Sequence, residues 1–292
     1  AEAHGHAKGA IKCPYHAWSY AYDGRLIGTP MVGKDEVDRD TLSLWPVRVE
    51  MWQGFAFVNL GEPGATLRES LEAQTDKPLQ YERWRMDELK TGHRSVTEVA
   101  ANWKILVENY NECLHCPTVH PQLNRLTPFR NSENDLDEGP VLGGPMWMTN
   151  PEGSMTMGGA RCAPAFPALS AEERGRVYYY TVFPSAFVSL HPDYVMLHRA
   201  LPVSRGHTRV VCEWFFHPDA IATPGFDPMP AVEFWDLTNR QDWELCENAH
   251  LGVVSNAWEP GPYSELESQL AAFDRHYLRV MNPEPVAVKA RG

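Results

Sequence analysis

Two histidines near the middle of the chain stand five residues apart on either side of a proline. His115 and His120 flank Pro117, and on an unbroken helix two such positions would point about 140° away from each other. A helix break at the proline would let the first ring leave the end of the helix and the second return from the next turn. Two imidazoles and one carboxylate on one face bind Fe(II) and leave coordination positions open. The spacing therefore makes a ferrous site one candidate.

Two other interpretations explain the same spacing. Cys113 and Cys116 stand beside the histidines, and two thiolates with two imidazoles form a closed, structural zinc site. The histidines are also compatible with ordinary polar residues that bind no metal. Spacing alone leaves all three interpretations open.

A ferrous site needs a carboxylate from a distant part of the chain. An acidic stretch within residues 231–250 offers Asp236, Asp242, Glu244 and Glu247. Periodicity does not choose among them, and most of them must be surface charges on an acidic helix.

A second pair of metal-ligand type lies near the start of the chain. Cys13 and His16 are separated by two residues, and a thiolate with an imidazole suits zinc or an iron–sulfur cluster. A packed cysteine beside an unrelated histidine has the same spacing, so this pair alone is half of a site at most.

The residues around both pairs resemble one family. Asn102-Trp103-Lys104, Glu108-Asn109 and the string from Glu112 to Pro121 resemble the catalytic-iron motif of Rieske-type oxygenase α subunits. The similarity is greatest to the branch that acts on quaternary ammonium compounds. The string CPYHAWSYAYDGRL around Cys13 resembles the second cluster-binding loop of the same family, with Ala17 in place of a common glycine.

The resemblance implies a ligand set for a mononuclear iron. His115 and His120 would ligate Fe(II), and Asp242 would be the third ligand, with Asp236 as the second choice. Cys113 and Cys116 would then be packing residues beside the site. The aromatic rings that line a substrate pocket cannot be chosen from the sequence.

The resemblance also gives Glu112 a role. It stands three residues before His115, on the same side of the predicted helix. In the family an acidic residue at this place connects the cluster of a neighbouring subunit to an iron ligand and carries electrons. Position alone favours a solvated carboxylate on the face of the helix. Asn109, one turn earlier, is a candidate for supporting the ligands.

The same family binds a [2Fe–2S] Rieske cluster through two cysteines and two histidines. Cys13 and His16 are half of such a ligand set, and the family's other Cys-x-His pair would fall before Ala1. His4 and His6 lie too close to Cys13 and bring no second cysteine. We therefore expect a truncated N-terminus, and a fragment that is inactive alone.

The elements that must position these residues form two groups. Residues 1–62 are expected to be a partial Rieske β domain, with hairpins turning at Asp23-Gly24 and Gln53-Gly54. Residues 63–292 are expected to be a catalytic domain, so that the fold class is α+β. The resemblance implies a helix-grip arrangement of an antiparallel sheet and helices.

Local patterns predict the elements of the larger domain. Capping boxes at Thr66 to Glu69 and Ser264 to Glu267 begin helices. The remaining predictions are an extended segment over 96–100, a helix over 102–115, long loops over 130–175, a meander of strands over 177–183, 186–190, 194–201 and 208–216, and a helix over 231–250.

Composition limits the partners. The 292 residues are 43% hydrophobic, and 26 basic against 38 acidic side chains give a net charge of −12. This acidic balance without a basic stretch argues against nucleic acid and anionic membranes, and no apolar run of about 18 residues could span a bilayer. Six cysteines in a long chain favour a reducing, cytoplasmic location of bacterial type, with thiols used for metal or packing rather than disulfides.

The function that the resemblance implies is that of a terminal oxygenase. It would take electrons from a flavin and iron–sulfur reductase, work as a homotrimer, and use O2 to hydroxylate or N-demethylate a small quaternary ammonium compound such as glycine betaine. The alternatives are an aromatic-ring or aromatic-acid hydroxylating dioxygenase, and a zinc-binding module without enzymatic activity.

Overall fold

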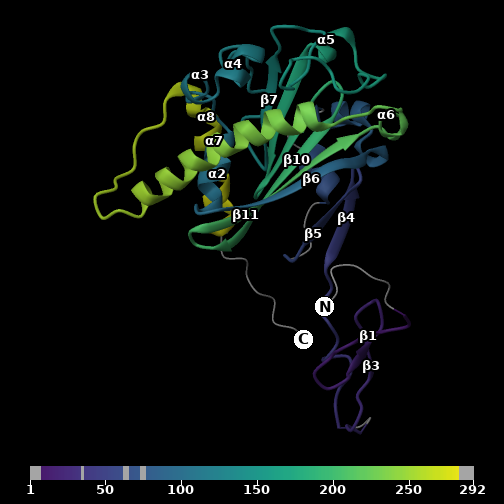
Figure 1. The fold of residues 1–292 in the computed structure, drawn as a ribbon. Helices are drawn as coiled ribbons and strands as arrows, with labels where there is room; N and C mark the ends of the chain where they lie inside the picture. Colours follow the sequence, from purple (N-terminus) through teal and green to yellow (C-terminus); the bar gives the residue numbers. More distant parts are fainter. Residues whose placement is uncertain (1–7, 34–35, 62–65, 73–76, 283–292) are drawn as a thin grey trace. The chain divides into compact units, whose positions relative to one another are not determined.

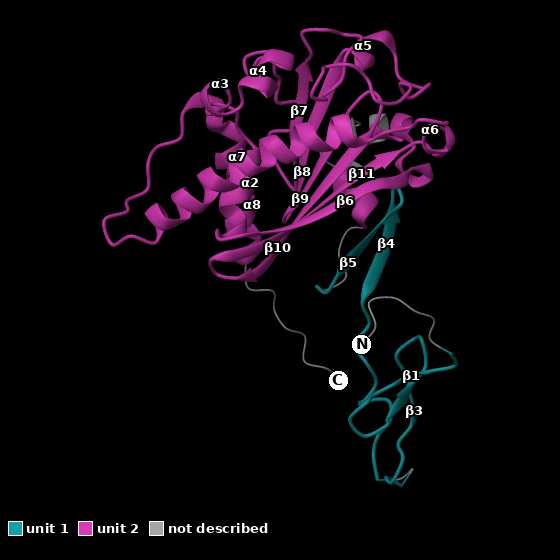
Figure 2. Cartoon of the chain, viewed as in Figure 1, with its two compact units in different colours: residues 1–64 teal, residues 65–292 magenta. Residues whose placement is uncertain are grey.

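The computed structural model describes residues 8–33, 36–61, 66–72 and 77–282. It divides into two compact units, residues 1–64 and residues 65–292 (Figure 2). That the first unit belongs to a Rieske domain stays a prediction.

The first unit contains the two predicted hairpins. Strands β1 (Ile11–Lys12), β2 (Ser19–Tyr20) and β3 (Leu26–Gly28) form a three-stranded sheet, and Gly24 between the last two has φ 90°. Strands β4 (Arg48–Trp52) and β5 (Phe55–Asn59) pair directly. Gln53 and Gly54 join them with φ of 49° and 82°, which is the turn type that two-residue hairpins require. Both hairpin predictions are confirmed.

The second unit is built on a six-stranded antiparallel sheet. Its strand order is β6-β11-β10-β9-β8-β7, so the four strands β8 to β11 form the predicted meander (Figure 1). The strands are β6 (Lys90–Val99), β7 (Val141–Trp147), β8 (Arg176–Val182), β9 (Ala186–Leu190), β10 (Val195–Ser204) and β11 (His207–Phe216).

Helices cover one face of this sheet. Figure 1 shows the long helix α7 crossing the sheet, and its inward side buries Phe234, Trp235 and Cys246. Among the described residues, no helix combines the length and apolar character needed to cross a bilayer. The helices are α1 (Leu67–Glu72), η1 (Lys77–Trp84), η2 (Met86–Glu88), α2 (Trp103–Tyr110), α3 (Cys116–Val119), α4 (Pro121–Leu126), α5 (Ala171–Arg174), α6 (Pro218–Ala222), α7 (Met229–Val253), η3 (Glu265–Glu267) and α8 (Ser268–Met281).

Both predicted capping boxes are present. Thr66 N donates to Glu69 Oε2, and Glu69 N donates to Thr66 Oγ1 at 3.1 Å. The same reciprocal pair joins Ser264 and Glu267 before α8. Each box satisfies N–H groups that the first turn of a helix leaves without partners.

The helix predicted over residues 102–115 is shorter than expected. It begins as predicted, since Asn102 caps α2 by accepting from Lys104 N at 3.1 Å, but it ends at Tyr110. Pro117 lies in the first turn of a new helix, α3, rather than after the old one. Proline is favoured there because the first turn needs no N–H donor. His115 therefore precedes α3 instead of ending α2.

The prediction of loops throughout residues 130–175 was wrong, because β7 forms an edge strand there. A Cβ at Gly143 would lie 1.9 Å from Tyr179 O, and a Cβ at Gly144 would lie 1.8 Å from Glu133 O. Glycines therefore allow backbones to approach on both sides. Pro145 is tolerated because an edge strand can lack a ladder hydrogen bond.

Asp193 is a buried anchor in the turn between β9 and β10, and only 1% of it is exposed. Its carboxylate accepts from Ser154 Oγ and, at 2.9 Å, from Cys162 N. Burial raises its pKa, while these hydrogen bonds oppose the rise. The side chain ties the 153–163 loop to the sheet.

We expect Asp193→Ala to lower the free energy of unfolding by about 2–4 kcal/mol, because it leaves the buried hydroxyl of Ser154 and the N–H of Cys162 without their charged acceptor. Urea denaturation would measure the change. The exposed Asp87 is the matched position, and Asp87→Ala should change stability by less than about 0.5 kcal/mol. Equal effects of the two substitutions would contradict the anchoring role.

Candidate metal centre and cavity

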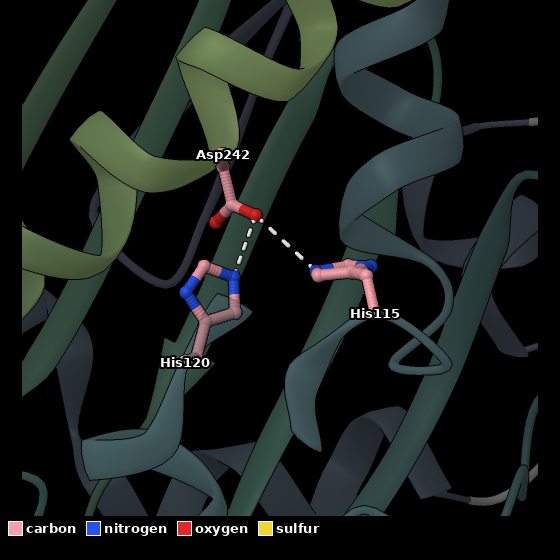
Figure 3. Close-up of side chains that lie close together, drawn as sticks. All are labelled: His115, His120 and Asp242. Atoms are coloured by element: carbon pink, nitrogen blue, oxygen red, sulfur yellow. Dashed lines mark hydrogen bonds and ion pairs between the residues drawn. The ribbon is translucent and has the colours of Figure 1, made fainter. Parts of the chain in front are cut away.

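Three separate elements bring the predicted ligands together. His115 lies in the turn before α3, and His120 lies between α3 and α4. Asp242 comes from the middle of α7. Figure 3 shows both imidazole rings turned toward one oxygen of Asp242. The helix break that the sequence predicts is present, but it lies at residues 111–115, before Pro117, and the proline begins a short helix with one histidine at each end.

The three side chains are close enough to share one ion. Asp242 Oδ1 lies 2.8 Å from His120 Nε2 and 3.3 Å from His115 Nε2. One ligand atom of each residue lies within 4.8 Å of the others. Within the described ranges, no other trio of histidine, cysteine or acidic side chains meets this criterion.

Each histidine is also held at its other ring nitrogen. His115 Nδ1 lies 2.6 Å from Glu112 Oε1, and His120 Nδ1 lies 2.8 Å from Gln241 Oε1. If each Nδ1 carries the ring proton and donates it, each Nε2 presents its lone pair toward the shared point. Such outer contacts orient metal ligands and raise their basicity.

The position of Glu112 differs from the prediction. It does not share a helix face with His115, because α2 has already ended. Glu112 lies in the connecting turn, where Oε2 accepts from Leu114 N and Oε1 contacts His115. The carboxylate therefore orders the turn and the ring together.

Hydrogen bonds among the three ligands keep His115 and Asp242 charged although both are partly buried. Burial alone would lower the pKa of His115, but hydrogen bonds to Asp242 and Glu112 outweigh it and raise that pKa to about 9. Burial would raise the pKa of Asp242, but hydrogen bonds from His115 and His120 hold it below its usual value. In the metal-free protein, Asp242 is therefore a carboxylate at neutral pH, available to a cation.

The donor set suits a ferrous ion. Two neutral imidazole nitrogens and one carboxylate oxygen are the ligands of a facial site with open positions. The alternative zinc site is not formed, because Cys113 and Cys116 are joined to each other in a disulfide.

This disulfide contradicts the expectation that the thiols are used for metal or packing rather than disulfides, although both cysteines do pack beside the site as predicted. The Cα atoms of Cys113 and Cys116 lie 5.0 Å apart across a tight turn, within the range that a disulfide spans. Both residues also line the cavity beside the histidines. The other described cysteines, among them Cys13 and Cys162, are free.

A cavity of about 610 Å³ opens onto the cluster. Tyr110, Tyr179 and Trp235 line it, with ring centroids 6.2 Å apart for the two tyrosines and 6.0 Å apart for Tyr179 and Trp235. The hydroxyl of Tyr179 is buried and has no partner among the described residues. Glu133, Glu265 and Arg130 also line the cavity, so it combines aromatic rings with charged groups, of which the carboxylates are the more numerous.

The other predicted candidates lie elsewhere or lack a defined contact. Asp236 pairs with Arg240 at 2.8 Å and is not in the cluster. Glu247 accepts from Ala100 N at 2.8 Å. Asn109 lines the cavity, and its side chain makes no hydrogen bond in the part of the chain that the structure describes. A supporting role for Asn109 stays a prediction.

Sequence reasoning missed Gln241, Tyr110 and Trp235 as residues of this site. Gln241 directly precedes Asp242, but consecutive helix residues point about 100° apart, so no local pattern indicated that both would contact His120. The two aromatic residues gave no such indication either, since they come from α2 and α7 and meet only in the folded chain.

The loop around Cys13 and His16, which was predicted to bind the cluster, is a closed turn in the structure. Cys13 N donates to Trp18 O at 2.8 Å, and Ala17 N donates to Cys13 O at 3.0 Å. Ala17 has φ 60°, a conformation that favours glycine, which is the residue common at this place in the resembling family. The assignment of Cys13 and His16 as cluster ligands stays a prediction.

The family model "Ring hydroxylating alpha subunit (catalytic domain)" matches residues 86–283. Glycine betaine monooxygenase oxygenase subunit of Chromohalobacter salexigens is 29% identical over 88% of this chain and 64% of that protein. Carnitine monooxygenase oxygenase subunit of Escherichia coli (strain K12) is 37% identical over 40% of this chain and 31% of that protein. The chain thus spans just under two thirds of the length of the glycine betaine relative.

Solved structures match the fold. The quaternary ammonium Rieske monooxygenase CntA in complex with gamma-butyrobetaine superposes with a TM-score of 0.68 at 22% identity, covering 94% of this chain and 72% of that one. Naphthalene 1,2-dioxygenase from Rhodococcus sp. gives 0.66 at 16% identity, over 96% and 77%. The predicted α+β fold is confirmed.

Proposed function

From the premise that this chain belongs to the family of ring-hydroxylating alpha subunits, we propose that it forms the catalytic part of a terminal oxygenase. The reaction is O2-dependent hydroxylation of an N-methyl group on a small quaternary ammonium compound such as glycine betaine, followed by loss of formaldehyde. The observation that carries the proposal is the convergence of His115, His120 and Asp242 at one end of a cavity with aromatic walls.

His115 and His120 would hold Fe(II) through Nε2, and Asp242 would hold it through Oδ1. The ion, when bound, supplies the redox chemistry that activates O2. The protein contributes a carboxylate that is already ionised and two rings whose Nδ1 atoms are engaged elsewhere. The three side chains therefore face one point before any ligand arrives, and His115, with its pKa raised to about 9, gives up a proton when it binds the ion.

The cavity favours a cation over a neutral aromatic ring. A trimethylammonium group offers no hydrogen-bond donor, and aromatic faces attract it by about 0.5–2 kcal/mol each. Tyr110, Tyr179 and Trp235 supply aromatic rings, and the carboxylates of Glu133 and Glu265 outnumber the one guanidinium, that of Arg130, in the cavity wall. Two of the relatives are named as monooxygenases of glycine betaine and of carnitine, which are both quaternary ammonium compounds.

The electron supply is part of the same proposal. Cys13 and His16 would be half of the ligands of a [2Fe–2S] Rieske cluster, and a flavin and iron–sulfur reductase would deliver the electrons in a cytoplasmic setting. The related CntA is described with inter-subunit electron transfer. We extend that arrangement to a homotrimer of this chain, in which Glu112 receives electrons arriving from a neighbouring subunit.

The test is turnover by the full-length product of the gene that encodes this chain. Loaded with iron, reduced and exposed to O2, it should release formaldehyde from glycine betaine, carnitine or choline, but convert no naphthalene or benzoate. Conversion of the aromatic compounds instead would establish the dioxygenase alternative. A tightly held zinc with no O2 consumption would establish the zinc-binding module.

A further inference from the structure

The imidazole of His120 is held at both nitrogens by two consecutive residues of α7. Nε2 lies 2.8 Å from Asp242 Oδ1, and Nδ1 lies 2.8 Å from Gln241 Oε1. The ring is 1% exposed, so bulk water does not replace either contact. These are the only hydrogen-bond partners of the ring in the part of the chain that the structure describes.

The proton of a neutral imidazole sits on one nitrogen only. A metal at Nε2 requires the proton on Nδ1, which then needs an acceptor. The carbonyl oxygen of Gln241 is such an acceptor. If the amide turned round, its NH2 group would donate to Nδ1, the proton would move to Nε2, and that N–H would donate to Asp242. In that state His120 binds no metal.

The neutral ring of His115 has no such second tautomer. Its Nδ1 faces a carboxylate oxygen of Glu112 at 2.6 Å, and an ionised carboxylate only accepts. The two histidines therefore differ in what lies behind them, although both reach the same point. Only His120 faces a group that can either accept or donate.

We propose that Gln241 is a positioning residue that sets the tautomer of His120, and through it the readiness of the site to bind metal. The side-chain nitrogen of Gln241 makes no hydrogen bond to any described residue, so among these residues only the ring of His120 bears on the orientation of the amide. The identity of the metal as Fe(II) rests on the proposed function, whereas the tautomer does not.

Two substitutions of Gln241 distinguish its role as a hydrogen-bond acceptor from a role in packing alone. Gln241→Glu keeps an acceptor of the same length and cannot donate when ionised, so metal affinity should be retained or increased. Gln241→Met keeps the length but removes the acceptor, and affinity should fall about 10- to 100-fold. Glu244→Gln, at an exposed position on the same helix, is the control and should not change affinity.

The affinity is measured by anaerobic titration of metal-free protein with Co(II), whose visible absorption reports binding. Nitrogen-15 NMR of labelled histidine in the metal-free protein reports the tautomer directly. A change in stability alone would not alter this signal. The Gln241→Met variant should lose the Nδ1-protonated form of His120 in favour of the Nε2-protonated form.

An unchanged tautomer in Gln241→Met, together with affinity within about twofold of the original protein, would overturn the proposal. Failure of the unsubstituted protein to bind Co(II) or Fe(II) would refute the proposed function instead. In that case the NMR comparison alone still decides the role of Gln241.

Discussion

Asp242→Ala should abolish stoichiometric iron binding while the fold stays intact. The substitution removes the single oxygen that lies 2.8 and 3.3 Å from the two imidazoles, and two histidines alone provide too few ligands for a facial ferrous site. It also removes the anion that stabilises a proton on His115, so the rings lose their shared partner. Iron analysis after anaerobic reconstitution should fall from about one ion per chain to background.

The chain offers a close control for this experiment. Asp236 lies on the same helix but pairs with Arg240, so Asp236→Ala should leave the iron content unchanged. Circular dichroism of both variants should match that of the original protein, because neither side chain belongs to the apolar core. Normal iron content in Asp242→Ala, or iron loss in Asp236→Ala, would refute the assignment of the third ligand.

The local part of the site could be predicted because short-range rules determine it. Pro117 predicts an interruption of the helix near the two histidines, and the structure has one between the end of α2 at Tyr110 and the start of α3 at Cys116. The capping boxes and hairpins depend on equally local patterns. The error in the length of α2 had a local cause too, because Pro117 can begin a helix as well as end one.

The long-range part needed the fold. Four acidic side chains along α7 were equivalent in periodicity, and only the packing of this helix on the sheet turns Asp242 toward the histidines. The strand β7 carries almost no alternation, since most of its residues are buried. Its glycines are explained by backbone contacts to Tyr179 and Glu133, which no local pattern contains.

The cavity shows the same limit. Tyr179 belongs to a run of three tyrosines that the sequence displays openly, but alternation along β8 sends its neighbours to the opposite face. Tyr178 and Tyr180 are buried there, with Tyr180 beside Tyr81 at 4.8 Å. Strand register decides which ring of the run meets Trp235, and this register depends on pairing with the neighbouring strands of the sheet.

Glu112→Gln is expected to have the second-largest effect, although it preserves the shape of the side chain. The two carboxylate oxygens of Glu112 face two N–H groups, the backbone N–H of Leu114 and, when protonated there, Nδ1–H of His115. A glutamine has one acceptor and one donor group, so one of the two donors must lose its partner. Iron affinity or turnover should fall about 10- to 100-fold.

Saturating iron separates the two roles that we propose for Glu112. If the residue only positions His115, excess Fe(II) should restore turnover of the full-length Glu112→Gln protein. If it also carries electrons, turnover should stay low with iron bound, and the reduced cluster should reoxidise slowly in O2 with substrate present. We expect the second outcome. Glu138→Gln, at an exposed position, should behave like the original protein, because its carboxylate contacts no residue of the metal centre.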